Sequence, residues 1–355
     1  MATANQSPPD VPFTAPRVLH TLEQTHIKLK VTAEGSPTYA YSLAVPRTWA
    51  YSKQFGPVSG GPFATRGIGF VAGSTRPGSP VIAVTVTPIP YEIPIDAWIR
   101  QSLTVEGWSL VSAKWFAGAR LFFDVVGARV INNVPEVRRT SVRVDAHNVF
   151  AVNCLCARKY WDEAKESFWV AHDTFQVENG TGTTQMEPWM AAHAADPDFQ
   201  LAHPRTWSAE SQTSPSDGIS AVHVRLIDAP GKTLLAYVQA KVERLTNNQP
   251  PPALDALVAT ASAKLQKTGF TPSQPPRPFT MDDDPRALAV PGWRGGFVGK
   301  GRLAKADVTI RMGFIARPGY SVTLLMLSPL LEDDPLTALR AQRAFEIAHH
   351  TLEIP

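Results

Sequence analysis

The sequence has little charge, no long hydrophobic run and only two cysteines. Charged residues occupy 18% of its 355 positions, where about 25% is usual. The formal net charge of +3 is too small to indicate by itself a nucleic-acid or membrane-surface partner. No apolar run approaches the roughly 18 residues of a membrane span, and the amino terminus lacks the basic start and apolar core of a secretory signal. We therefore expect a cytoplasmic protein whose two cysteines are reduced.

Proline, by contrast, is abundant: its 32 residues are about double the usual share. Hydrophobic residues make up 44% of the chain, as in globular proteins. Few charges combined with many prolines suggest long, shaped loops and an apolar surface that meets a partner.

A heptad that occurs twice organises the chain. Residues 43–49 (LAVPRTW) and 201–207 (LAHPRTW) are identical at six of seven positions. Internal repeats decide the architecture, so they are considered before local structure. The length of 355 residues is enough for two domains of ordinary size, each with its own core. The heptads therefore predict two copies of one domain.

Four later pairs of segments match in the same order, as a tandem duplication requires. The chain would then be an internal pseudo-dimer, of unknown oligomeric state. A strand predicted at 27–31 precedes the first heptad and has no clear counterpart in the second copy. The matching pairs are residues 81–86 and 234–238 (strands), 94–106 and 252–267 (helices), 136–156 and 307–327 (hairpins, matched without a gap), and 168–177 and 345–354 (ends of terminal helices).

The repeat sets the predicted domain boundaries. They give a flexible extension at 1–16, a first domain at 17–177, a linker at 178–197 and a second domain at 198–355. Each copy is predicted as strand, strand, strand, helix, hairpin, helix. Consecutive strands joined by short turns favour an antiparallel sheet with helices packed against it. The predicted fold class is therefore α+β, with an α/β/α sandwich in each copy.

In each copy a strand ends in Pro-x-x-Trp, at Pro46 and Trp49 and again at Pro204 and Trp207, and a hairpin and an apolar-striped terminal helix follow. This arrangement resembles the PsbP-like superfamily, which includes the photosystem protein PsbP, the envelope protein DcrB and the EagR chaperones. The resemblance implies two PsbP-like domains. For EagR-like members it implies a chaperone that holds apolar segments of type VI secretion effectors before export.

No catalytic set of residues is visible, so we expect no enzymatic activity, no cofactor and no metal. Cys154 and Cys156 lie on one strand face, where a disulfide is poorly placed, and a zinc site would need further ligands. We expect buried free thiols there. His172 and His349 occupy equivalent positions near helix ends, where a histidine is favourably placed, and a duplicated base is the alternative. No serine or cysteine recurs beside them as a nucleophile.

Charged and glycine-rich segments are more simply explained as loops or solvated faces than as sites. Residues 295–301 lack the spacing of a phosphate-binding loop and are predicted as a turn between strands. The acidic run 282–284 is predicted as a solvated loop, and the run 332–334 as the start of a helix with Pro335 at its first position. Arg139 and Arg143 share a strand face that we expect to be solvated, with nucleic-acid contact as the alternative.

Four side chains are predicted to contact a partner. Trp49 and Trp207 are the tryptophans that the copies share, and each either packs in the core or lines the rim of a groove. Trp98 belongs to the first copy, where most other tryptophans gather, and such an aromatic-rich patch suits a hydrophobic partner. Leu257 belongs to the apolar stripe of the helix at 252–267.

These features predict a non-enzymatic protein-binding module. Its partner would be a protein with an apolar segment, and neither nucleic-acid binding nor membrane insertion is expected. A cytoplasmic chaperone or adaptor for a type VI secretion effector is the specific form of this prediction. The alternative is a structural or assembly component of a larger bacterial complex.

Overall fold

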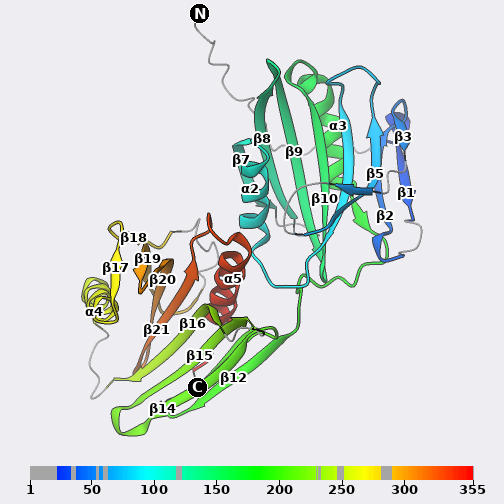
Figure 1. Cartoon of the computed structure of the whole chain (residues 1–355). Helices are drawn as coiled ribbons and strands as arrows, with labels where there is room; N and C mark the ends of the chain where they lie inside the picture. Colours follow the sequence, from blue (N-terminus) through cyan, green and yellow to red (C-terminus); the bar gives the residue numbers. More distant parts are fainter. Residues whose placement is uncertain are drawn as a thin grey trace, which may run out of the picture. The chain divides into compact units, whose positions relative to one another are not determined.

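The computed structural model describes residues 22–32, 37–52, 56–58, 63–116, 122–228, 230, 233–245, 252–280 and 290–354. The predicted extension at 1–16 and the acidic run at 282–284 lie outside these ranges. The chain forms two compact units (Figure 1). Unit 1 comprises Met1–Pro90 and Ile95–Met186, and unit 2 comprises Tyr91–Pro94 and Glu187–Pro355.

Antiparallel strands make up most of unit 1, and two longer helices pack against them. Its elements are α1 (Leu22–Thr25), β1 (His26–Val31), η2 (Pro37–Tyr39), β2 (Tyr41–Pro46), β3 (Ala50–Ser52), β4 (Gly56–Val58), β5 (Thr65–Ala72), β6 (Val81–Pro88), α2 (Ile95–Val105), β7 (Ser109–Phe116), β8 (Phe122–Ile131), β9 (Val134–Asp145), β10 (Asn148–Ala157), the 3-10 helix η3 (Arg158–Tyr160), α3 (Trp161–Thr174) and β11 (Gln176–Val177).

Unit 2 has the same kind of composition. Its elements are β12 (Trp189–Ala195), β13 (Asp198–Pro204), β14 (Ser208–Ser214), η4 (Pro215–Asp217), β15 (Ile219–Asp228), β16 (Thr233–Arg244), α4 (Leu254–Lys267), β17 (Phe270–Pro272), β18 (Arg277–Pro278), β19 (Trp293–Leu303), β20 (Ala306–Arg317), β21 (Tyr320–Pro329) and α5 (Pro335–Thr351).

Each unit contains an eight-stranded antiparallel sheet, and the strands follow one order in both. The order is β3-β5-β6-β10-β9-β8-β7 in unit 1, where β4 also pairs with β5. It is β14-β15-β16-β21-β20-β19-β17 in unit 2, where β18 also pairs with β19. The helix α3 packs against β2 and β10, and α5 packs against β13 and β21. The predicted α+β class is confirmed.

The strand that leads into the heptad has a partner strand in both units. β1 pairs with β2, with His26 opposite Pro46, and β12 pairs with β13, with Trp189 opposite Pro204. β12 is therefore the counterpart of β1. No clear sign of such a strand is present in the sequence of the second copy, and β12 lies inside the range predicted as linker. Alanine-rich β12 (WMAAHAA) has no clear apolar alternation, so periodicity does not reveal it.

The end of each terminal helix is fixed to the heptad strand in the same way. Thr174 Oγ1 accepts a hydrogen bond from the Ala44 N–H at 2.8 Å and donates to the Val170 carbonyl. Thr351 Oγ1 accepts from the Ala202 N–H at 2.8 Å and donates to the Ile347 carbonyl. Because Ala44 and Ala202 are the second residues of the two heptads, one polar contact recurs in both units.

The central hairpins correspond with a shift of one residue from the predicted match. Asp145 pairs with Asn148 across one turn, and Arg317 pairs with Tyr320 across the other. Arg139 therefore takes the position of Arg311, six residues before the turn in each strand. A slip of one residue exchanges the two faces of a strand, so the ungapped match of 136–156 with 307–327 assigned the wrong faces to one another.

The glycine-rich segment 295–301 lies in strand β19, so the predicted turn is wrong. The glycines permit close packing of backbone and side chains. A Cβ on Gly296 would lie 2.1 Å from the Met312 carbonyl oxygen, and one on Gly301 would lie 2.4 Å from the Phe270 ring. A strand can contain several glycines where another part of the chain approaches closely.

Unit 2 includes the short segment Tyr91–Pro94. Side chains of unit 2 bind this segment through an ion pair and hydrogen bonds. The buried Glu92 carboxylate accepts from Arg343 Nε and from Trp189 Nε1, each at 3.0 Å. The Glu92 N–H donates to Glu187 Oε1 at 3.0 Å. A buried carboxylate needs such partners to offset its loss of hydration, so these contacts fix the segment in unit 2.

The core of each unit includes the terminal helix. Phe168 of α3 and Phe345 of α5 are fully buried, and burying such a side chain stabilises a fold by about 1.5–3 kcal/mol. α5 begins as predicted, since the Asp334 side chain accepts from the Thr337 N–H at 3.1 Å and Pro335 follows it. Among the described residues, no helix has the length and apolar character to span a membrane.

Candidate protein-binding surface

The turn between β8 and β9 exposes apolar side chains at its tip. Ile131 pairs with Val134, and the two residues between them are Asn132 and Asn133, at φ of 49° and 62°. Two left-handed residues in a two-residue loop are typical of a type I′ hairpin, and asparagine tolerates that conformation. The strands therefore stay paired to the tip, where Val130 is 67%, Val134 45% and Ile131 39% exposed.

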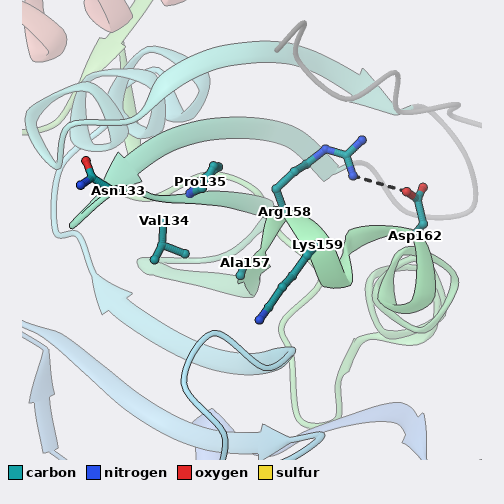
Figure 2. A pocket seen from close by; sticks show the side chains of 7 residues that line it. All are labelled: Asn133, Val134, Pro135, Ala157, Arg158, Lys159 and Asp162. Atoms are coloured by element: carbon teal, nitrogen blue, oxygen red, sulfur yellow. Dashed lines mark hydrogen bonds and ion pairs between the residues drawn. The ribbon is translucent and has the colours of Figure 1, made fainter. Parts of the chain in front are cut away.

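A cavity of about 770 Å³ lies beside this tip (Figure 2). Pairing of β9 with β10 creates it, because Glu136 lies opposite Ala157 and the chain then enters η3. The start of β9 and the end of β10 thereby meet. The lining residues are Asn133, Val134, Pro135, Ala157, Arg158, Lys159 and Asp162.

The cavity has a basic wall. Arg158 Nη1 lies 3.4 Å from Asp162 Oδ2, and Lys165 Nζ lies 2.9 Å from Asp162 Oδ1. The hydrogen bond from Lys165, and then that from Arg158, lowers the pKa of Asp162, which is ionised at neutral pH. In Figure 2 Arg158 extends toward Asp162, whereas Lys159 points the other way. Two cations thus line the cavity with a single carboxylate.

The basic wall is specific to unit 1. β10 and β21 each begin directly after the hairpin turn and are ten residues long, ending at Ala157 and Pro329. The next two residues are Arg158 and Lys159 in unit 1, but leucines 330 and 331 in unit 2. The shared topology does not account for the two cations, which distinguish unit 1 from unit 2.

The four residues predicted to contact a partner lie elsewhere, two in each unit. Trp49 is half-buried, packs edge-on against Phe168 and lines a separate cavity of about 310 Å³. Trp98 is buried in unit 1 at 9% exposure, and Trp207 in unit 2 at 4%. Leu257 is half-buried on α4 and packs on the core beneath it. Their role in partner binding stays a prediction.

Sequence reasoning missed the residues of the hairpin surface, although one signal was present. Asn132 and Asn133 stand between apolar residues in the sequence, and asparagine is favoured at the two central positions of a type I′ turn. The cavity gives no such signal, because Asn133 and Arg158 are far apart in the sequence and only strand pairing brings them together.

The arginines predicted to be solvated are buried, so that prediction is wrong. Arg139 Nε donates to Asp124 Oδ1 at 2.8 Å, and both side chains are inaccessible to solvent. Arg143 donates to the carbonyls of His172, at 3.0 Å, and Phe175. The last carbonyls of a helix lack intrahelical partners, so Arg143 serves the end of α3. The covering helix makes this face of β9 an interior one.

His172 is also interior. Its Nδ1 lies 2.5 Å from Ser141 Oγ, and burial, together with Arg139 and Arg143, lowers its pKa well below the usual value. The imidazole is therefore neutral, and the predicted benefit of a charged histidine at a helix end does not apply. Its equivalent His349 is buried too, with its ring 4.7 Å from that of Trp293.

The prediction for the cysteines is confirmed. Cys154 and Cys156 are free and buried. Burial raises the pKa of Cys154 well above its usual value and that of Cys156 to about 12. A thiol is reactive as its thiolate, so both sulfurs are inert at neutral pH.

Comparison with known proteins gives weak similarities of fold. No protein-family model and no curated protein matches the chain. Cyanobacterial PsbP from Synechocystis sp. PCC 6803 is 14% identical over 43% of this chain and 92% of that chain, with a TM-score of 0.34. LpqN of Mycobacterium tuberculosis, described as involved in cell envelope biogenesis, is 16% identical over 42% and 90% of the two chains, with a TM-score of 0.29.

A third similar structure spans nearly the whole chain. The type VI secretion immunity protein TplEi of Pseudomonas aeruginosa is 11% identical over 94% of this chain and 98% of that chain, with a TM-score of 0.23. A PsbP protein, from the superfamily that the sequence resembles, is thus among the similar structures, and all three similarities are weak. They concern the fold alone.

Proposed function

We propose that this protein is a non-enzymatic protein-binding module built from two copies of one fold, and that unit 1 contacts the partner through the β8–β9 tip. The observation that carries the proposal is the exposure of Val130, Ile131 and Val134 at a tip that lies beside a cavity with a basic wall. Apolar side chains gathered at a rigid edge lose unfavourable contact with water when a partner covers them. The tight turn holds them in place before binding, which lowers the entropic cost of association.

In its specific form, the partner is a secreted effector of the type VI system, and the protein is its cytoplasmic chaperone or adaptor. The apolar tip suits a partner segment that is itself apolar and would aggregate when exposed. Shielding such a segment requires a binding surface but no catalytic group.

Binding without catalysis agrees with the places of the most perturbed ionisable groups. Burial shifts the pKa values of Tyr41, Cys154 and His172 furthest from their usual values. All three side chains are sealed in the core of unit 1, away from the cavity. Perturbed groups often mark catalytic sites, but a reacting group must also be reached by its substrate.

The test is affinity purification of the tagged chain from its native host, followed by mass spectrometry. Val130→Ser with Val134→Ser removes the two most exposed of the three apolar side chains at the tip of unit 1. Arg302→Ser with Ala306→Ser changes the equivalent, exposed positions of the β19–β20 turn and serves as the matched control. We expect one stoichiometric partner, lost with the unit 1 variant and kept with the control.

The outcomes distinguish the alternatives. A single partner with apolar segments supports the effector chaperone, whereas several subunits of one machine support an assembly component. A chain that purifies alone, or a partner that the unit 1 variant retains in full, contradicts the proposal.

A further inference from the structure

We infer that the cavity beside the β8–β9 tip binds a carboxylate of the partner segment. In the free protein Asp162 pairs with Arg158, and the carboxylate of the partner replaces it on binding. This inference rests on the proposed function and names the chemistry of the partner. Arg158, Lys159 and Asp162 are the charged residues that line the cavity. An acidic side chain entering it meets two cations and one carboxylate, and that carboxylate is already engaged.

The contact between Arg158 and Asp162 is built to be exchanged. At 3.4 Å this hydrogen bond is longer than the usual 2.7–3.2 Å and therefore weak. Arg158 uses Nη1 alone for it, whereas a guanidinium can hold a free carboxylate through two parallel N–H groups. Both side chains are accessible to solvent, and such exposed ion pairs contribute little. Arg158 can therefore turn to an incoming carboxylate at small cost.

Asp162 keeps a partner when Arg158 leaves. Lys165 Nζ lies 2.9 Å from its other carboxylate oxygen, at the favourable i,i+3 spacing on α3. The departure of Arg158 thus leaves no unpaired anion in the wall. Asp162 is then a substitute for the partner's carboxylate, and it competes with it for Arg158.

Lys159 strengthens the preference for an acid. In the part of the chain that the structure describes, no carboxylate forms an ion pair with it, and its Nζ lies 4.8 Å from the centre of the Tyr160 ring. Its side chain extends away from Asp162 in Figure 2. A second acidic residue of the partner, or the same one in a different rotamer, can reach it.

The apolar part of the lining defines the rest of the ligand. Val134, Pro135 and Ala157 line the cavity, and the exposed Val130 stands next to it at the tip. The occupant that fits is an extended segment in which acidic and apolar residues alternate. Unit 2 has leucines at the positions of Arg158 and Lys159, so this pair of cations is a feature of unit 1.

The experiment titrates the ¹⁵N-labelled full chain with acetyl-Leu-Glu-Val-Glu-Leu-amide and with its counterpart containing glutamine for glutamate. A hydrogen bond to a charged group is worth about 1.5–3 kcal/mol, so the glutamate peptide should bind at least about tenfold more tightly. We expect it to shift the amide signals of Asn133, Arg158 and Lys159. Arg158→Gln should abolish the preference for glutamate.

The direction in which Asp162→Asn changes the affinity for the glutamate peptide is the decisive observation. Because it removes the competing carboxylate, it should tighten binding of the glutamate peptide about 2–5-fold, the range of an exposed ion pair. Asp173→Asn removes an exposed charge from the same helix, away from the cavity, and should leave binding unchanged. Weaker binding by Asp162→Asn, equal binding of the two peptides or no shift overturns the inference. Equal shifts by inorganic phosphate at the same concentration also overturn it.

Failure of this inference can be distinguished from failure of the proposed function. A partner captured through Val130 and Val134, combined with no preference for glutamate, overturns the inference alone. A clear preference for glutamate in a chain that captures no partner overturns the proposed function and leaves the chemistry of the cavity standing.

Discussion

The buried ion pair of unit 1 gives the most demanding prediction. Arg139 Nε and Asp124 Oδ1 are 2.8 Å apart out of reach of solvent, and the Arg139 guanidinium lies 4.5 Å from the Trp169 ring centre. Arg139→Met keeps a long apolar side chain but leaves the Asp124 carboxylate without this cation. Removing one member of a buried pair costs about 3–5 kcal/mol. We expect the free energy of unfolding of unit 1 to fall by that amount at pH 7.

The loss depends on pH in a defined direction. Burial raises the pKa of Asp124, Arg139 lowers it, and the net result lies above the usual value. Without Arg139 the pKa rises further. A carboxyl whose folded pKa exceeds its unfolded pKa contributes stability below the unfolded value and loses it as the pH rises through the folded value. The destabilisation by Arg139→Met should therefore shrink as the pH falls from 7 toward the unfolded pKa of about 3.9.

Urea unfolding followed by tryptophan fluorescence, at pH 7 and pH 5, measures both effects. Asp124→Leu with Arg139→Met replaces the pair by apolar side chains, and such replacements are neutral or stabilising by about 1–4 kcal/mol. Arg66→Met is the matched control at an exposed arginine, expected within about 0.5 kcal/mol of the parent. A loss below about 1 kcal/mol for Arg139→Met, or a double variant as unstable as the single one, would refute the reasoning.

Two further predictions concern the repeated contacts and the thiols. Thr174→Val leaves the Ala44 N–H without its acceptor and should cost unit 1 about 1–3 kcal/mol, while Thr351→Val should do the same to unit 2 through Ala202. Thermal unfolding of the two variants checks this, and a variant that melts like the parent contradicts it. Cys154 and Cys156 should resist a disulfide reagent at pH 8 in the native chain and both react in urea, because burial raises their pKa values. Rapid reaction of either thiol in the native chain would show that the core opens there.

The sequence predicted those parts of the fold that depend on local signals. Short-range chemistry predicts the strands that end in the heptads, the two hairpins and the helix start at Asp334. The structure contains each of them. Elements without a local signature escaped. β12 is too rich in alanine to show alternation, and the glycines of β19 make sense only when the strand beside them is known.

Burial of charge was the hardest feature to predict. Arg139 and Arg143 share a face of β9 with Ser141, opposite Val142 and Val144, as residues on a solvated face do, and only the covering helix makes their face an interior one. The surface proposed to bind a partner was missed for a related reason. Its residues come from a turn and a 3-10 helix that only the pairing of β9 with β10 brings together.

The place of Glu92 has a consequence for the modularity of the chain. Because Tyr91–Pro94 completes unit 2, neither unit corresponds to one uninterrupted stretch of sequence. A fragment that begins at Glu187 would contain every strand and helix of unit 2 and still lack the carboxylate that Trp189 and Arg343 share. Recombination at the repeat boundary would therefore separate unit 2 from part of its own interior. The two units are interleaved in the sequence, and a cut at Glu187 does not yield a complete unit 2.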